Sequence, residues 1–348
     1  MHRYALLAFL SLALLAGCSS NTPEGPTSAK PPEKAGETVT MGDYQLHAPI
    51  QTGSVSIIPI SLTKEMPKQD GDFMTLSEAQ KQGLVTISEL GEGDVNALRV
   101  ENKGTRPLLL LGGDLLLGGK QDRIVAKDTI VPPGKTMNVD VFCVEHGRWE
   151  EQSEHFDYKQ TVVPNEVRDA AAYGDQEKVW AKVDSYNYAN GAVSSGVTVR
   201  QGMESEKVKQ AMSEDVPKVL EALNGRKNVV GFIYVRNGEI QSADIFGSPR
   251  IMDQAKESLL KGYLADGASH KAESNASLSM DTCKKFMEEV IDGRKARAKN
   301  QVAGKAQQYQ GRNTRGIEVQ ALGGYPGNAS PVDASGFVHG TYAPSNKR

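Results

Sequence analysis

The stretch GGDLLLGGKQDR at residues 112–123 decides how the first half of the chain is expected to fold. Two glycine pairs, Gly112–Gly113 and Gly118–Gly119, bracket three leucines, and glycine allows the backbone conformations that tight turns require. The spacing predicts a β-hairpin: the first pair turns the chain, the leucines return it to the core, and the second pair ends the strand. The polar residues are then expected near strand ends, as a solvated rim or a recognition surface: Asp114, Lys120, Gln121 and Arg123.

The same stretch does not meet the requirements of a phosphate-binding P-loop, which needs G-x-x-x-x-G-K-[ST]. Counting back from Lys120, Gly119 is in place, but Asp114 stands where the first glycine should be. Gln121 follows the lysine and offers no hydroxyl group for a magnesium ion. We therefore interpret the stretch as a hairpin with polar ends, and not as a nucleotide-binding loop.

Short β-rich runs continue on both sides of this stretch, separated by glycine and proline turns. One short helix is expected at residues 75–83, with Ser77 as its cap. Many strands with little helix predict an antiparallel β-sandwich or barrel-like N-terminal part. The expected strands lie at residues 54–62, 84–91, 97–104, 106–119, 123–134 and 136–147.

The second half adds helical periodicity, so the predicted fold class is α+β. Asn237–Gly238 lies between two β runs and is the strongest short-range signal for a two-residue hairpin. Pro217 is expected in the first turn of a helix, because proline in a helix interior removes a hydrogen bond. Residues 41–163 and 164–345 are interpreted as a β-rich half and an α+β half of one domain. Helices are expected at 175–188, 204–212, 213–225, 248–264 and 279–293, and closing strands at 315–324 and 335–344.

The N-terminus has the features of a bacterial lipoprotein signal. The apolar run from Ala5 to Gly17 is too short to span a bilayer and is typical of a signal peptide. Leu15-Ala16-Gly17-Cys18 is similar to a lipobox, so residues 1–17 are expected to be removed and Cys18 to carry the lipid. An ordinary signal peptide that contains a cysteine is the alternative. Ser19 after the cysteine favours the outer membrane, facing the periplasm or the cell surface.

Residues 18–40 are rich in Pro, Ser, Thr, Gly and Glu, and they predict a disordered tether between the lipid and the folded part. The chain has 40 Lys+Arg and 43 Asp+Glu, and loss of Arg3 with the signal leaves 39 − 43 = −4. This balance does not favour a nucleic-acid partner. Cys143 and Cys283 remain after lipidation; a disulfide and two separate buried thiols are both open. No C-x-x-C or H-E-x-x-H occurs, so neither a metal nor another cofactor is predicted.

A second polar stretch, CVEHGRWEEQSEH at residues 143–155, contains Arg148 beside Trp149. A planar cation next to an indole can hold an anion or a ring. We expect the two polar stretches to meet and form one ligand-binding cluster. The alternative is a buried structural network in which Glu145 pairs with Arg148 or Arg123 and nothing binds. The predicted ligand-binding residues are Lys120, Gln121, Arg123, Glu145, Arg148 and Trp149.

No catalytic residue is predicted. The G-x-S-x-G nucleophile motif is missing, because Ala192 stands where the first glycine would be needed before Ser194 and Ser195. His339 lies in the last expected strand and is interpreted as structural. The sequence therefore leans towards a protein that is not an enzyme.

The run from Arg99 to Glu150 resembles the ARPP domain family, the ADP-ribosyl-glycohydrolase and rhodanese/phosphatase-superfamily-associated protein domain. The family's E-N step, P-x-L-L-L strand, G-G-K-Q-x-R turn, proline-rich turn and C-V-E-x-G-R-W segment have counterparts here. Asp114 stands where the family usually has glutamate, and the lipid anchor departs from its typical, cytoplasmic members. The resemblance covers about residues 50–343 and implies a fold, but no reaction, because the family's activity is unassigned. The matching segments are Glu101–Asn102, Pro107–Leu110, Gly118–Arg123, Val131–Gly134 and Cys143–Trp149.

Together these features predict a membrane-anchored extracytoplasmic lipoprotein whose ARPP-like domain is a non-catalytic ligand-binding or scaffold domain. One alternative is a hydrolase or processing enzyme for a phosphate-bearing or ADP-ribose-like ligand. Another is a structural envelope lipoprotein. The expected partners are the membrane, through the lipid anchor, and a small anionic ligand or an envelope protein.

Overall fold

The most apolar strands of the chain build a central antiparallel sheet, and they come from both ends of the sequence. The computed structural model describes residues 38–64, 73–91, 94–192, 198–273, 278–297, 306–321 and 337–345. Within these residues nine strands form the sheet in the order β1-β2-β4-β14-β15-β18-β17-β16, and β3 pairs with β4. Their bounds are β1 (Val39–Met41), β2 (Tyr44–Leu46), β3 (Ile50–Thr52), β4 (Val55–Leu62), β14 (Val229–Arg236), β15 (Glu239–Phe246), β16 (Gln307–Gln310), β17 (Thr314–Gln320) and β18 (Phe337–Pro344).

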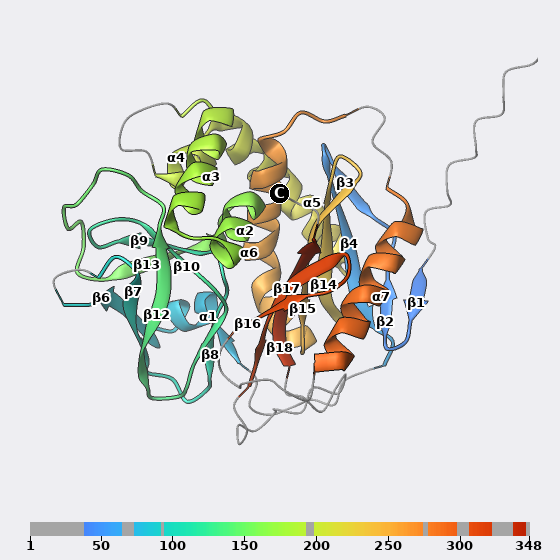
Figure 1. Cartoon of the computed structure of the whole chain (residues 1–348), viewed down its shortest axis with the longest axis horizontal. Helices are drawn as coiled ribbons and strands as arrows, with labels where there is room; N and C mark the ends of the chain where they lie inside the picture. The colour runs from blue at the N-terminus through green and yellow to red at the C-terminus, as the bar shows by residue number, and fades with distance from the viewer. Residues whose placement is uncertain are drawn as a thin grey trace, which may run out of the picture. The chain divides into compact units, whose positions relative to one another are not determined.

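Helices cover both faces of the central sheet (Figure 1). Helices α5 (Glu206–Leu223) and α6 (Pro249–Ala268) pack on one face, and α7 (Met280–Arg297) packs on the other. Successive residues of a strand point to opposite faces, so Ile57 of β4 joins the core under α6 whereas Ile58 joins the core under α7. Burial on both faces explains why β4 and β14 read as almost continuous apolar runs.

A second sheet curls into the barrel-like N-terminal part that the sequence predicts. Its order in the described residues is β13-β9-β10-β12-β7-β6, and an antiparallel bridge between Ser88 and His155 brings its two edges together. A small sheet, β11-β8-β5, completes the enclosure of a separate apolar core. The bounds are β5 (Met74–Thr75), β6 (Val85–Glu89), β7 (Ala97–Asn102), β8 (Leu108–Leu110), β9 (Asp114–Gly118), β10 (Arg123–Val125), β11 (Thr129–Val131), β12 (Thr136–Cys143) and β13 (Phe156–Val162), with α1 (Leu76–Lys81) beside them.

The two glycine pairs of residues 112–123 have different structural roles. The hairpin forms between β9 and β10, where Leu116 pairs with Arg123. Gly118 is the last residue of β9 and pairs with Phe156 of β13, and Gly119 begins the turn. The first pair does not close a hairpin, because β8 pairs with β11 and β9 pairs with β10 and β13. Gly113, with φ of 93°, instead passes the chain from one sheet to the other. A Cβ atom at Gly113 would lie 2.8 Å from Cγ of Arg168, so the crossing also needs glycine for space.

Three further helices lie between the barrel-like part and α6: α2 (Asn165–Tyr173), α3 (Gln176–Ala189) and α4 (Val199–Met203). The α+β class is thus confirmed, and two local expectations were wrong. Thr75, and not Ser77, caps α1, because its hydroxyl accepts the N–H of Glu78. Pro217 lies in the interior of α5. The carbonyl that loses its partner there belongs to exposed Ser213, where water can replace the hydrogen bond.

Several features predicted from the sequence lie outside the described residues or at their ends. The signal peptide, Cys18, most of the expected tether, and Ser194 and Ser195 lie outside them. Strand β1 begins at Val39, inside the last two residues of the expected tether. Cys143 and Cys283 are both free and buried, so no disulfide joins them. No helix of the described residues is long and apolar enough to cross a membrane.

The Asn-Gly hairpin is confirmed. Arg236 and Glu239 form the last pair of β14 and β15, and the two residues between them have positive φ, 47° at Asn237 and 75° at Gly238. Two left-handed residues match the right-handed twist of the flanking strands. This turn sets the register of the two strands at the centre of the main sheet.

Replacing Gly238 by valine is expected to lower the free energy of unfolding by about 1 kcal/mol or more, because a β-branched residue resists positive φ. Gly238→Asn is the matched control, since asparagine tolerates this region, and it should cost clearly less. Urea denaturation of both variants measures the difference. A valine variant as stable as the wild type would contradict the turn conformation.

Candidate functional site

A buried network of charged side chains joins the central sheet to α2. Asp244 of β15 accepts hydrogen bonds from both terminal nitrogens of Arg168, at 2.8 and 2.7 Å, and from the Thr341 hydroxyl at 2.7 Å. The hydroxyl of Tyr263 on α6 donates to the same carboxylate. Burial alone would raise the pKa of Asp244, but Arg168 and His339 outweigh burial and hold it well below its usual range. Asp244 is therefore a permanent buried anion.

His339 connects this carboxylate to a second one. Its Nε2 lies 3.0 Å from Asp244, its Nδ1 lies 2.5 Å from Asp128, and its side chain is fully buried. Burial lowers the pKa of His339, but the two carboxylates prevail and raise it to about 9. The ring is thus an imidazolium at neutral pH, and both of its nitrogens donate to carboxylates. A histidine in this state has no free nitrogen with which to accept a proton as a general base.

Asp128 and Arg168 also hold the chain between β8 and β9. The second oxygen of Asp128 accepts the N–H of Gly112 at 2.8 Å, and Nε of Arg168 donates to the carbonyl of Gly112 at 2.6 Å. The glycine that begins the crossing between the two sheets is therefore bonded through both of its backbone groups. The network fixes the barrel-like part against the central sheet.

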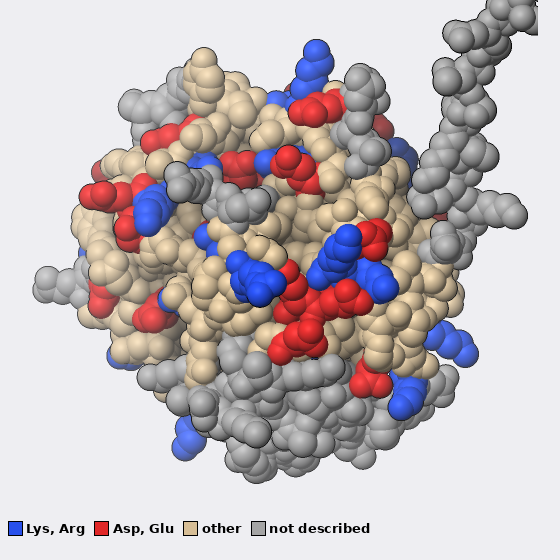
Figure 2. Space-filling view, turned by 45° about the vertical axis from the view of Figure 1, so that its right-hand side comes forward, with Lys and Arg blue, Asp and Glu red and all other residues tan. Residues whose placement is uncertain are grey.

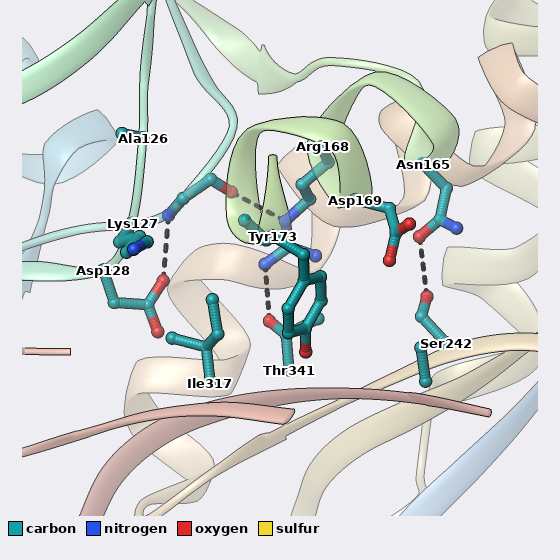
Figure 3. A pocket seen from close by; sticks show the side chains of 13 residues that line it. Ala126, Lys127, Asp128, Asn165, Arg168, Asp169, Tyr173, Ser242, Ile317 and Thr341 are labelled. Atoms are coloured by element: carbon teal, nitrogen blue, oxygen red, sulfur yellow. Dashed lines mark hydrogen bonds between the residues drawn. The ribbon is translucent and has the colours of Figure 1, made fainter. Parts of the chain in front are cut away.

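A small pocket opens above this network (Figure 3). It has about 30 Å³ of solvent-accessible space, and because one water needs roughly 10–15 Å³ on such a measure, it has room for about two. Residues of α2, β15, β17, β18 and the segment after β10 line it. The lining residues include Lys127, Asn165, Arg168, Ala172, Tyr173 and Ile317.

Three hydrogen-bond donors of this pocket have no partner among the described residues. The Tyr173 hydroxyl is buried and bonded to nothing. The oxygen of the Asn165 side chain accepts the Ser242 hydroxyl at 2.7 Å, which leaves the amide nitrogen available. Lys127 lines the pocket, and no ion pair joins it to a carboxylate of the described residues. Of the three, the Tyr173 hydroxyl is the buried donor without a partner, whereas Lys127 is only half-buried. A buried donor without a partner is costly, so the Tyr173 hydroxyl in particular is suited to an acceptor that comes from outside.

The charges around the pocket favour an anion. At neutral pH they comprise four cations, Lys127, Arg168, Arg315 and His339, and three anions, Asp128, Asp169 and Asp244, a balance of 4 − 3 = +1. Arg315 lies over the Tyr173 ring at 4.3 Å and contacts Asp169 at 2.7 Å. Behind Gly113, burial raises the pKa of Asp114 to about 7, so this carboxyl is half ionised and reduces the balance without reversing it. One of its oxygens is buried without a partner.

The six ligand-binding residues predicted from the sequence do come together, at the turn between β9 and β10. Arg148 donates to Glu145 through Nε at 2.8 Å and NH2 at 2.6 Å, and its NH1 donates to the carbonyls of Gly119 and Glu150. Glu145 also accepts the backbone N–H of Asp122 at 2.9 Å. The Arg148 guanidinium is thus occupied by the protein itself. This geometry corresponds to the structural network that the sequence left as the alternative.

Of the other predicted ligand-binding residues, some are buried in the interior and some lie at the surface. Arg123 is fully buried and donates to the backbone and side chain of Gln121, whose own amide donates to the Glu145 carbonyl. The solvated rim expected for these residues was therefore wrong, because β12 and the segment that follows it cover the turn. Trp149 is 48% exposed, and the Lys120 ammonium lies 5.2 Å from the centre of its ring. Lys120 and Trp149 remain at the surface.

Sequence reasoning missed most of the pocket. Asp244 and Arg168 lie in a strand and a helix whose patterns predict only secondary structure, and nothing in their spacing links them. His339 was interpreted as structural from its place in a strand, and its buried contacts agree with that role. The one available signal was a charged residue in the apolar run that ends at Phe246, because a buried charge requires a partner. No group of three or more His, Cys, Asp or Glu in the described chain is placed to bind a metal.

Replacing Arg148 by alanine would remove the cation that Glu145 and Asp122 share, and would leave Asp122 with Arg200 alone, at 3.9 Å. Burial and then Glu145 already raise the pKa of Asp122, so the loss should destabilise the protein by on the order of 3 kcal/mol. Lys120→Ala is the control at the same turn and should cost less than about 1 kcal/mol. Thermal and urea unfolding measure both. Equal and small losses would mean that the Arg148 contacts are not structural.

Comparison with known proteins identifies the family to which the chain is similar. A model of the ARPP-1 domain, described as the ARG and Rhodanese-Phosphatase-superfamily-associated Protein domain, matches residues 43–330. No curated protein and no solved structure gave a significant match. The matched range contains both the β9–β10 turn and most of the residues that line the pocket.

Proposed function

Since the chain belongs to the ARPP-1 family, whose description names no reaction, we propose that it is an envelope-anchored lipoprotein that binds a small anion without catalysis. The observation that carries the proposal is the pocket above Arg168, with three donors that have no hydrogen-bond partner in the described part of the chain and a net positive surrounding charge. Such a site gains most from an acceptor that bears negative charge.

The same pocket argues for binding rather than for catalysis. The buried dyad of His339 and Asp128 has the composition of a catalytic pair, but the imidazolium already donates from both nitrogens. The Thr341 hydroxyl belongs to the same network, where it is bonded to Asp244 and Arg168. A nucleophile needs a base that can take its proton, and His339 cannot act as one because both of its nitrogens are already bonded to carboxylates.

The size of the pocket and the distribution of charge on the molecule's surface both agree with a small ligand. Nucleotide-sized ligands occupy sites of roughly 300–1,000 Å³, whereas this pocket has about 30 Å³ of solvent-accessible space. On the face that Figure 2 shows, basic and acidic side chains are interspersed and no broad basic area stands out. Extended basic surface is the usual footprint of nucleic-acid binding. A localised anion site therefore accounts better for the unpaired lysine than a large polyanion does.

The anion site predicts a ligand-dependent gain in stability, because a ligand that binds only the folded state raises the melting temperature. We expect sodium acetate or sodium phosphate, compared with sodium chloride at equal ionic strength, to raise the melting temperature of the wild type. Lys127→Met should abolish that rise. Lys135→Met is the matched control, since Lys135 is an exposed lysine in the turn before β12, and it should keep the rise. No shift in the wild type with either anion would refute the anion site.

The envelope location rests on the lipobox-like segment and is tested separately. Cys18→Ser removes the thiol that would receive the lipid, so the protein should move from the membrane fraction to the soluble extracytoplasmic fraction. Ser19→Ala is the control and should remain in the membrane fraction. Full-length Cys18→Ser protein that stays membrane-bound would show that the anchor is of another kind.

A further inference from the structure

If the pocket binds an anion, as proposed above, its donors and apolar walls restrict which class of anion fits. The first constraint is the number of donors. An ionised carboxylate has two oxygens with about four lone-pair sites. The Lys127 ammonium, the Asn165 amide nitrogen and the Tyr173 hydroxyl are the available donors that line the pocket. Three donors suffice for two oxygens.

Tetrahedral oxyanions present oxygens on every side, whereas the donors of this pocket do not surround it. At least one of the four oxygens of phosphate or sulfate would face the apolar walls of the pocket. Those walls are methyl and methylene groups of Ala126, Ala172, Ile317 and Ala343, and three of these four residues are at least 95% buried. An oxygen that loses water and gains no donor is destabilised by several kcal/mol on transfer scales.

The apolar walls suit the other end of a carboxylic acid. Ile317 and Ala343 come from β17 and β18, and Ala172 comes from the last turn of α2, opposite the sheet. A methyl or short alkyl group would lie between them. Figure 3 shows Ile317 below Arg168 and Tyr173, with Lys127 and Asn165 on opposite sides of the space. The pocket thus combines a few donors with a short hydrophobic wall.

We propose that the pocket binds a short monocarboxylate of acetate or propionate size, with its two oxygens at Lys127, Asn165 and Tyr173 and its alkyl group against Ala172 and Ile317. The carboxylate would come from a free acid or from the C-terminus of a peptide. In both cases the pocket recognises the same planar anion.

The test is isothermal titration calorimetry of the folded, lipid-free domain with acetate, propionate, N-acetyl-alanine, phosphate and sulfate, each at constant ionic strength. Acetate or propionate should bind at least tenfold more tightly than phosphate and sulfate. N-acetyl-alanine distinguishes the two sources, because a peptide C-terminus should bind as tightly as propionate only if the mouth of the pocket admits the chain beyond its first carbon.

Two matched substitutions locate the binding. Ala172→Leu places a larger side chain in the pocket wall and should weaken propionate binding at least tenfold. Ala181→Leu, at an exposed position of α3 outside the pocket, should leave it unchanged. Melting temperatures of both variants verify that they are folded.

The outcomes separate this inference from the binding function on which it rests. Phosphate binding that exceeds propionate binding and is lost in Lys127→Met would keep the anion site and overturn the carboxylate class. Carboxylate binding that survives Ala172→Leu would place the ligand elsewhere and overturn the inference. Absence of binding by all five compounds would overturn both.

Discussion

The ion pair between Arg168 and Asp244 is the interaction on which the rest of the structure depends. It joins α2 to the middle of the central sheet, and through Gly112 it reaches the crossing between the two sheets of the barrel-like part. Both groups are almost completely buried. Taking two charges out of water costs several kcal/mol per ion, and only complete hydrogen bonding compensates that cost. Asp244 meets this condition through Arg168, Tyr263, His339 and Thr341.

The need to hydrogen-bond the buried ion pair completely explains why the layers pack in one specific way better than it explains the stability of the fold. Apolar cores under α6, under α7 and inside the barrel-like part would tolerate small shifts of one layer against another, because apolar packing is not directional. A bidentate guanidinium–carboxylate pair fixes both distance and orientation. We infer that the apolar cores drive the collapse and that the buried polar network selects one way of placing the barrel-like part on the sheet.

The two polar clusters of the molecule differ in how the protein itself engages their cations. At the β9–β10 turn, Arg148 is consumed by Glu145 and by backbone carbonyls. Arg123 keeps two buried nitrogens without a hydrogen-bond partner there, but the Glu89 carboxylate lies 3.9 Å from one of them and balances its charge. Above Arg168, donors are left over after the protein's own acceptors have been counted. A binding site for an anion is expected where donors exceed acceptors. The proposed function therefore follows from the balance of hydrogen-bonding groups, and the abundance of charged residues in the sequence was a poorer guide.

The sequence by itself determined the elements and many of their ends. Alternating apolar residues and the Asn237–Gly238 turn are local signals, and the chain follows them because φ restrictions act over a few residues. From the sequence it could also be predicted that the two polar stretches meet, and they do so at the β9–β10 turn. The tertiary structure alone decided which strands pair, for β4 lies beside β14 across more than 160 residues of chain. It alone made Arg123 a buried residue, and it alone assembled the pocket from α2, β15, β17, β18 and the segment after β10. Such contacts depend on how layers with similar apolar faces dock, and no pattern within one segment records which partner will cover it.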